Sequence, residues 1–401
     1  MNVDNAVTAG NKGDKVKQDC FVTLESGVTG GLDIQIDFPG DPGNADAIKA
    51  LAEDVCGFFG MTSASLRIED RGAPDFVLCA RIEACIKKVM DSGKNYLPEM
   101  KPENLAKTTK NRMRMSRLYI PGNTPKMMLK SGTHGSHAII FDLEDAVAPA
   151  KKAEARLLVR NGLRQVDFNG AERMVRINQL PLGLEDLEQL VPHNVHILLI
   201  PKCESGEDIK AVNARIKEIQ QGEDNPETVY LMPIVETCRG LLNAAEIAAA
   251  GDNLVALTIG LEDYTADLGV QRTVEGTESF YARSHLAVVC KAHGLQAIDS
   301  VFSNFGDPEG LAATVRRSKS LGYQGMGCIH PTQIPVVHEG YAPEPAEIEK
   351  AQKIVDAFEE AGRKGLGVVS LGTKMIDPPV VDRAFQVIEK AAALNLLPQN
   401  R

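Results

Sequence analysis

Hallmarks of several protein classes are missing from this 401-residue sequence. No apolar run approaches the ~20 residues needed to span a bilayer, and the N-terminus lacks the apolar stretch of a secretory signal. No basic block offsets the net charge of −10, although phosphate neutralisation in nucleic-acid binding needs clustered Lys and Arg. We therefore expect a cytoplasmic enzyme with neither membrane nor nucleic acid as a partner.

Cysteine and histidine patterns of metal centres are also missing. None of the eight cysteines stands in a CxxC pair, and several lie inside apolar segments. Scattered cysteines in a chain without a secretory signal are usually reduced and buried, so we predict free thiols. The HxxH pairs at residues 134–137 and 193–196 have no third ligand nearby, which argues against zinc.

What is present indicates two domains, at about 100–200 residues per domain. Residues 1–90 have the pattern of a small α+β domain. Its first helix is expected from an N-cap at Asn44 to Gly60, and its last over residues 82–90. The expected strands are residues 20–24, 32–37, 65–69 and 76–80.

A linker and a longer domain follow. Residues 91–111 contain two prolines and no sustained periodicity, as linkers do. Over residues 112–401, eight apolar runs alternate with amphipathic helices, which predicts an α/β fold of the TIM-type (β/α)8 barrel class. A doubly wound open sheet is the alternative, but no GxGxxG motif follows the first run. The runs are residues 118–120, 138–141, 174–177, 196–200, 229–234, 255–259, 297–301 and 325–329.

Charged residues stand where five consecutive strands are expected to end. In a barrel, the carboxyl ends of the strands carry the catalytic groups. A single acidic residue there often only caps the next helix, but repetition at one rim predicts an active site. The residues are Asp142, Glu144 and Asp145, then Arg176, then Lys202 and Glu204, then Glu236, then Glu262 and Asp263.

Glu236 and Asp263 end adjacent expected strands, so their carboxylates can converge on one cation. With two protein carboxylates, Mg2+ fits best, because it keeps waters and accepts substrate oxygens. Arg176 can bind a substrate carboxylate bidentately, which lysine does less well. The structural alternative for Arg176 is an ion pair with Asp142 or Glu144.

Ten segments resemble the citrate lyase β-subunit family, in the family's order, over about residues 112–395. The resemblance implies a Mg2+-dependent lyase acting on CoA or CoA-like thioesters. It also implies a homotrimer or a multiple of three, with a citrate lyase α subunit as a candidate partner. The segments are residues 116–122, 141–147, 175–178, 200–205, 233–237, 260–263, 281–284, 297–299, 329–331 and 374–377.

The same resemblance implies roles for single residues. It places Glu236 and Asp263 on the family's magnesium ligands, and Arg176 on the arginine that binds the keto-acid carboxylate. Lys202 is a further substrate-binding candidate. The residues expected to support the site without binding the metal are Glu144 and Asp145.

Asp377 matches the acidic residue that, in related thioester lyases, enters the site from a neighbouring subunit. It is the candidate for proton transfer, and a plain surface turn is the alternative. A lid is expected beside it, in the segment that contains Gly362, Gly365, Gly367 and Gly372. The run Arg112, Arg114 and Arg117 is either a phosphate site for a CoA-like arm or a solvated entrance to the first barrel strand.

Residues 1–90 resemble the citrate lyase γ subunit, an acyl carrier protein, at segments 9–10, 19–22, 70–75 and 80–84. The family attaches its CoA-like group to a serine, and the matching position here is Lys17 or Gln18. Residues 11–19 contain no Ser or Thr, so no attachment residue is expected.

The chain is therefore expected to be a γ–β fusion that splits a citryl thioester into oxaloacetate and an acetyl thioester. One alternative is a stand-alone malyl-CoA or citramalyl-CoA lyase with a degenerate carrier domain. The other is a non-catalytic scaffold.

Overall fold

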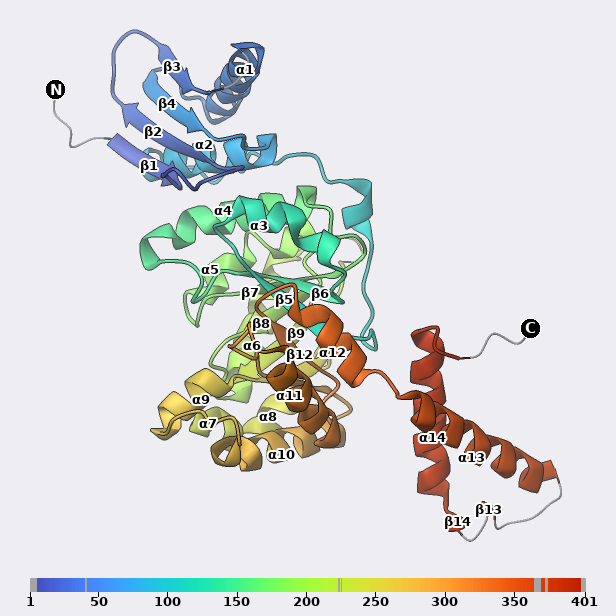
Figure 1. Ribbon diagram of the computed structural model, residues 1–401. Coiled ribbons are helices and arrows are strands. Elements are labelled where there is room, and N and C mark those ends of the chain that lie inside the picture. Colours follow the sequence, from blue (N-terminus) through green and yellow to red (C-terminus); the bar gives the residue numbers. More distant parts are fainter. Residues whose placement is uncertain are drawn as a thin grey trace. The chain divides into compact units, whose positions relative to one another are not determined.

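The computed structural model describes residues 6–39, 42–222, 224, 226–363, 369–371 and 374–397 (Figure 1). The chain divides into two compact units, Met1–Ile334 and Pro335–Arg401. No helix in the part of the chain that the structure describes has the length and hydropathy of a membrane-spanning segment. The eight cysteines are free, and all but the half-buried Cys238 are buried, as predicted.

The N-terminal region is a four-stranded sheet with two helices packed against it. The strand order is β1–β2–β4–β3, in which only β3 and β4 are parallel. The strands expected at residues 20–24, 32–37 and 65–69 are confirmed, and Gly60 ends the first helix with φ +79°. The elements are β1 (Ala6–Gly10), β2 (Cys20–Ser26), β3 (Leu32–Asp37), α1 (Pro42–Phe59), β4 (Ala64–Asp70) and α2 (Asp75–Val89).

The strand expected at residues 76–80 is wrong, because these residues form the first turns of α2. Every residue from 76 to 86 is buried, since the helix lies between the sheet and the barrel helix α4 (Lys152–Gln165). A helix buried all round has a continuous apolar run without a 3.6-residue period, and such a run looks like a buried strand. β1 has no counterpart among the expected strands.

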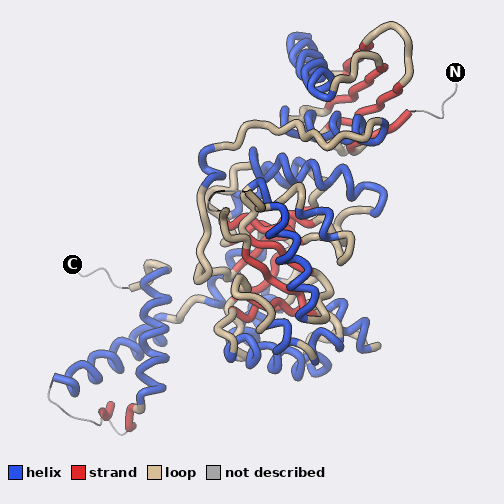
Figure 2. The backbone as a smooth tube through the Cα atoms, turned by 180° about the vertical axis from the view of Figure 1, so that it is seen from behind, coloured by secondary structure: helices blue, strands red, loops and turns tan. Residues whose placement is uncertain are grey.

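Eight parallel strands form a closed barrel in sequence order, which confirms the predicted fold; Figure 2 shows them in red, surrounded by helices. The open-sheet alternative is wrong, because β12 hydrogen-bonds to β5 and leaves no free edge. The strands are β5 (Ser116–Pro121), β6 (Ala138–Asp142), β7 (Glu172–Arg176), β8 (Ile197–Ile200), β9 (Tyr230–Val235), β10 (Ala256–Ile259), β11 (Gln296–Asp299) and β12 (Gly325–Cys328). The helices between them, besides α4, are α3 (Pro125–Lys130), α5 (Gly183–Leu187), α6 (Gly206–Ile219), α7 (Cys238–Leu242), α8 (Ala244–Ala248), α9 (Leu261–Leu268), α10 (Thr277–Ala292) and α11 (Pro308–Ser320).

Two arginines of the basic run lie inside the barrel. Arg114 is 1% exposed, and its Nε lies 2.7 Å from Glu172 Oε2. Arg117 is fully buried and donates from Nη1 to Thr258 Oγ1 at 3.1 Å. Neither Arg114 nor Arg117 is therefore part of a solvated strand entrance, and Arg117 lines the cavity described below.

The second compact unit contains two long helices that pack against each other. Four glycines belong to the expected lid. Gly362 lies in the last turn of a helix, and Gly365, Gly367 and Gly372 lie outside the described residues. The elements that follow β12 are α12 (Gln333–Tyr341), α13 (Pro345–Arg363), β13 (Val369–Leu371), β14 (Lys374–Ile376) and α14 (Pro378–Ala393).

Candidate active site

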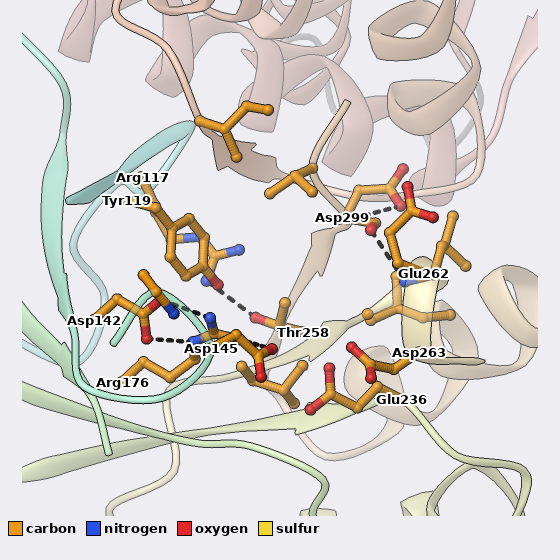
Figure 3. Close-up of a pocket in the computed structure, with 18 of the residues that line it drawn as sticks. Arg117, Tyr119, Asp142, Asp145, Arg176, Glu236, Thr258, Glu262, Asp263 and Asp299 are labelled. Atoms are coloured by element: carbon orange, nitrogen blue, oxygen red, sulfur yellow. Dashed lines mark hydrogen bonds and ion pairs between the residues drawn. The ribbon is translucent and has the colours of Figure 1, made fainter. Parts of the chain in front are cut away.

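A cavity of about 480 Å3 lies at the carboxyl end of the barrel strands (Figure 3). In Figure 3, Arg176 and Asp142 lie together at one side of the cavity, and Glu236 lies beside Asp263 at the other. These side chains follow four different strands, so closure of the barrel brings them together. The lining residues that the sequence singles out are Arg117, Asp142, Asp145, Arg176, Glu236, Glu262 and Asp263.

Arg176 ends β7, and acidic side chains hold its guanidinium. Nε and Nη2 donate to the two carboxylate oxygens of Asp142 at 2.7 and 2.6 Å, and Nη1 lies 2.7 Å from Glu144 Oε2. Burial acts to lower the pKa of Arg176, but the Asp142 carboxylate raises it well above its usual range. The ion pairs considered as an alternative are thus present, and Arg176 also lines the cavity.

Asp142 is itself fixed by the turn that follows β6. Its carboxylate accepts hydrogen bonds from the backbone N–H groups of Glu144 at 2.9 Å and Ala146 at 3.3 Å. Glu144 Oε1 accepts from Gln179 Nε2 at 2.9 Å, and burial raises the pKa of Glu144. Asp145 differs, because its side chain is 60% exposed and lies 3.5 Å from Arg176.

Glu236 follows β9 and is only 3% exposed. Its Oε1 accepts a hydrogen bond at 2.7 Å from the backbone N–H of Lys202, a residue with the left-handed φ of +46° that non-glycine residues seldom adopt. Burial raises the pKa of Glu236 to about 8, and the charges of Asp263 and Glu144 add to the increase. A cation at this carboxylate would relieve that repulsion.

Asp263 lies in the first turn of α9, where Lys202 Nζ reaches it at 3.1 Å. Lys202 thus supplies the positive charge next to the two carboxylates. Oxygen donors from Glu236 and Asp263 suit a hard divalent cation that keeps several waters, as Mg2+ does. Among the described residues, no group of three or more His, Cys, Asp or Glu is placed to hold a metal. The two oxygen donors, Glu236 and Asp263, fit a magnesium site that leaves positions open for water and substrate.

Gly260 lies directly before α9, and the Glu236 side chain packs against it in the place that a Cβ would occupy. A Cβ at this position would lie 2.4 Å from Glu236 Oε2 and 2.7 Å from Glu236 Cβ. We expect Gly260→Ala to displace Glu236, to lower stability by about 1–3 kcal/mol and to weaken Mg2+ binding. Thermal unfolding and calorimetric titration with Mg2+ measure the two effects.

The matched control is Gly57→Ala on α1, where a Cβ would meet nothing within 4 Å. Alanine is the better helix former, so this variant should keep or gain stability and bind Mg2+ normally. Wild-type Mg2+ affinity in Gly260→Ala would contradict the assigned role of Glu236.

Some residues of the cavity wall are absent from the predicted site. Asp299 ends β11, lines the cavity and forms an ion pair with Arg283 of α10. Like Glu236, Asp299 stands at the carboxyl end of a barrel strand, so the expectation that catalytic groups lie at strand ends could have indicated it. Arg117 and Thr258 lie inside their strands and point into the cavity. Strands that are buried on both faces show no alternation of polar and apolar residues, so the sequence does not tell which of their side chains face the inside of the barrel.

Other predicted positions are not among the residues that line this cavity; Lys202 and Glu204 line a second cavity. Asp377 is exposed and takes the N-cap position of α14 in the second compact unit, and its role stays a prediction. In the carrier-like region, Lys17 is exposed. Gln18 has φ +58° and donates its backbone N–H to Arg71 O at 2.8 Å.

Comparisons with known proteins match two separate stretches of the chain. Residues 115–331 match a family described as HpcH/HpaI aldolase/citrate lyase, and residues 8–89 match one described as malonate decarboxylase delta subunit (MdcD). The chain is 37% identical to citrate lyase subunit beta of Leuconostoc mesenteroides subsp. cremoris, over 71% of this chain and 96% of that protein. It is 35% identical to human mitochondrial citramalyl-CoA lyase, over 69% and 85%. A structure of CitE from Mycobacterium tuberculosis, in complex with magnesium, acetoacetate and coenzyme A, matches with a TM-score of 0.58 and 30% identity, over 71% of this chain and 100% of that one.

Proposed function

Because this chain belongs to the HpcH/HpaI aldolase/citrate lyase family, we propose that it is a Mg2+-dependent carbon–carbon lyase that splits a citryl thioester into oxaloacetate and an acetyl thioester. The observation that carries the proposal is one cavity that combines Arg176 with the carboxylates of Glu236 and Asp263. The magnesium, acetoacetate and coenzyme A of the CitE complex support the same ligand classes here.

In this reaction the bond between the hydroxyl-bearing carbon and the carbon next to the thioester breaks. The hydroxyl loses its proton to solvent and becomes the keto group of oxaloacetate. The electron pair of the broken bond goes to the thioester fragment as an enolate, which then takes a proton at carbon. Glu236 and Asp263 would hold Mg2+, which when bound supplies Lewis acidity toward the substrate hydroxyl and its neighbouring carboxylate.

Arg176 would bind the keto-acid carboxylate, and Lys202 would add a second positive charge. Because Asp142 and Glu144 fix the guanidinium, Arg176 is oriented before the substrate arrives. The exposed Asp145 is its loosest partner, so a substrate carboxylate can take that place. Asp377 would protonate the enolate carbon as a general acid.

We expect the intact chain from its native host to carry no covalent group on residues 11–19. Attachment through a phosphodiester requires a hydroxyl, and NKGDKVKQD has none. Intact-mass measurement and peptide mapping test this directly. A mass increment on Thr8, Thr23 or Ser26 would show that the acceptor lies elsewhere in this region.

A stand-alone malyl-CoA or citramalyl-CoA lyase is the second candidate, and the missing hydroxyl favours it. A chain that cannot carry its own arm must take free CoA thioesters or borrow a carrier, for instance in a complex with a citrate lyase α subunit. A non-catalytic scaffold is disfavoured, because the cavity keeps the residues for both metal and substrate.

A turnover assay separates these candidates. Purified chain is supplied with Mg2+ and, in parallel, citryl-CoA, malyl-CoA and citramalyl-CoA, and the keto acid released is quantified. Preference for citryl-CoA supports the proposal, and preference for either of the others supports the second candidate. No release from any of the three would refute lyase activity on free CoA thioesters.

A further inference from the structure

Two buried ion pairs join α2 of the N-terminal region to α4 of the barrel. In one pair the arginine belongs to α2, and in the other it belongs to α4. Arg81 of α2 lies 3.3 Å from Glu154 of α4 (Nη1 to Oε1). Arg160 of α4 donates to both carboxylate oxygens of Glu83 of α2, at 3.0 and 2.6 Å. All four side chains are at most 1% exposed. A shift between the helices would leave charges buried without partners, so the pairs specify one docked arrangement.

Arg81 also reaches the segment that follows β5. Its Nη1 donates to Asn123 Oδ1 at 2.7 Å, while Nε and Nη2 are held by the Asp19 carboxylate at 3.0 Å each. Asn11 Nδ2 donates to the backbone oxygen of Asn123 at 2.7 Å. The N-terminal region therefore holds Asn123 by both its side chain and its backbone.

From Asn123 the contacts continue to the active site. The neighbouring Gly122 donates its N–H to Asp142 O at 2.8 Å, and the Asp142 carboxylate holds Arg176 through two hydrogen bonds. The approach is close, since a Cβ on Gly122 would lie 2.7 Å from Asp142 O. Pro121 and Met127, on either side of this segment, line the cavity.

We propose that Arg81, a residue of the carrier-like region, is a positioning residue for the barrel's active site. Through Asn123 it fixes the segment between β5 and α3, and with it the Asp142 carboxylate that orients Arg176. The carrier-like region then holds a segment of the barrel in place, a role that needs no covalent arm. The inference rests on the proposed function only for the identity of the ligand, a keto acid.

Asn123→Ala in the full chain tests this link, because Arg81 keeps Asp19 and Glu154 and no buried charge loses its ion-pair partner. We expect KM for the keto acid, measured in the condensation direction, to rise about tenfold while kcat changes by less than about twofold. Arg81→Lys should shift KM in the same direction. Combining it with Asn123→Ala should add little, since both changes break one chain of contacts.

The matched control is Glu83→Gln combined with Arg160→Gln, which removes the other ion pair of the same interface without touching Asn123. This variant should have a lower Tm but a KM within about twofold of wild type. Amide exchange at Gly122 and Thr124 gives a readout independent of turnover. It should be faster in Asn123→Ala and unchanged in the control.

Wild-type KM together with wild-type exchange in Asn123→Ala would overturn the proposal. An equal rise of KM in the control would also overturn it, because docking in general would then be responsible. If the wild-type chain cleaves none of the three thioesters, the proposed function fails. Exchange at Gly122 would still decide whether Arg81 and Asn123 fix this segment.

Discussion

Replacing Glu236 with glutamine is expected to lower kcat/KM for thioester cleavage by at least about 1,000-fold, because loss of the metal removes several kcal/mol of charge stabilisation in the transition state. Asp263→Asn should act in the same way. The fold should survive, since burial and the neighbouring carboxylates raise the pKa of Glu236 to about 8, and glutamine relieves that unfavourable charge. Turnover against Mg2+ concentration, calorimetric Mg2+ titration and thermal unfolding measure these effects.

Glu204→Gln is the matched control on the same rim. The Glu204 side chain is 40% exposed and lies 3.8 Å from Arg239, outside the metal site. It should keep wild-type turnover and Mg2+ affinity. If the carboxylates only capped helices, the Glu236 and Asp263 variants would lose about 1 kcal/mol of stability and little activity. Near-normal turnover of Glu236→Gln at moderate Mg2+ would refute the metal assignment.

The barrel was predictable because each of its strands is short, apolar and separated from the next by an amphipathic helix. Parallel strands covered by helices are buried on both faces, so their signal is a compact apolar run. The same rule failed at residues 76–80, where α2 is enclosed by the sheet and by α4. A helix shows a 3.6-residue hydrophobic period only when one of its faces is exposed to solvent. Both faces of α2 are covered, so its sequence lacks that period.

The site was predictable to the extent that its residues follow strands. Arg176, Glu236 and Asp263 meet in one cavity, as the strand-end rule indicates. The contacts that orient them were not predictable. The backbone N–H of Lys202, a residue with a left-handed φ, donates to Glu236. The link from Arg81 to Asn123 joins residues 42 positions apart, and no sequence pattern marks such a pair.

The second large effect is expected at Asp377. If it protonates the enolate carbon, Asp377→Asn should lower kcat by about 100-fold or more, while Mg2+ affinity stays at its wild-type value. The side chain is exposed at the start of α14, so the fold should tolerate the change. Steady-state kinetics and Mg2+ titration of the variant test this. A wild-type rate would remove Asp377 from the mechanism, and the proton at carbon would then come from another group or from solvent.

A mixing experiment then decides whether Asp377 acts within its own chain or on a neighbour. Asp377→Asn and Glu236→Gln chains, each inactive alone, are co-expressed with different tags and purified as mixed assemblies. If a neighbouring subunit supplies Asp377 in a threefold ring, every mixed ring has both residues intact at one of its three sites, which is about a third of the sites. Activity should return toward that fraction of wild type. If Asp377 acts within its own chain, every site lacks one of the two residues, and no mixture can recover activity.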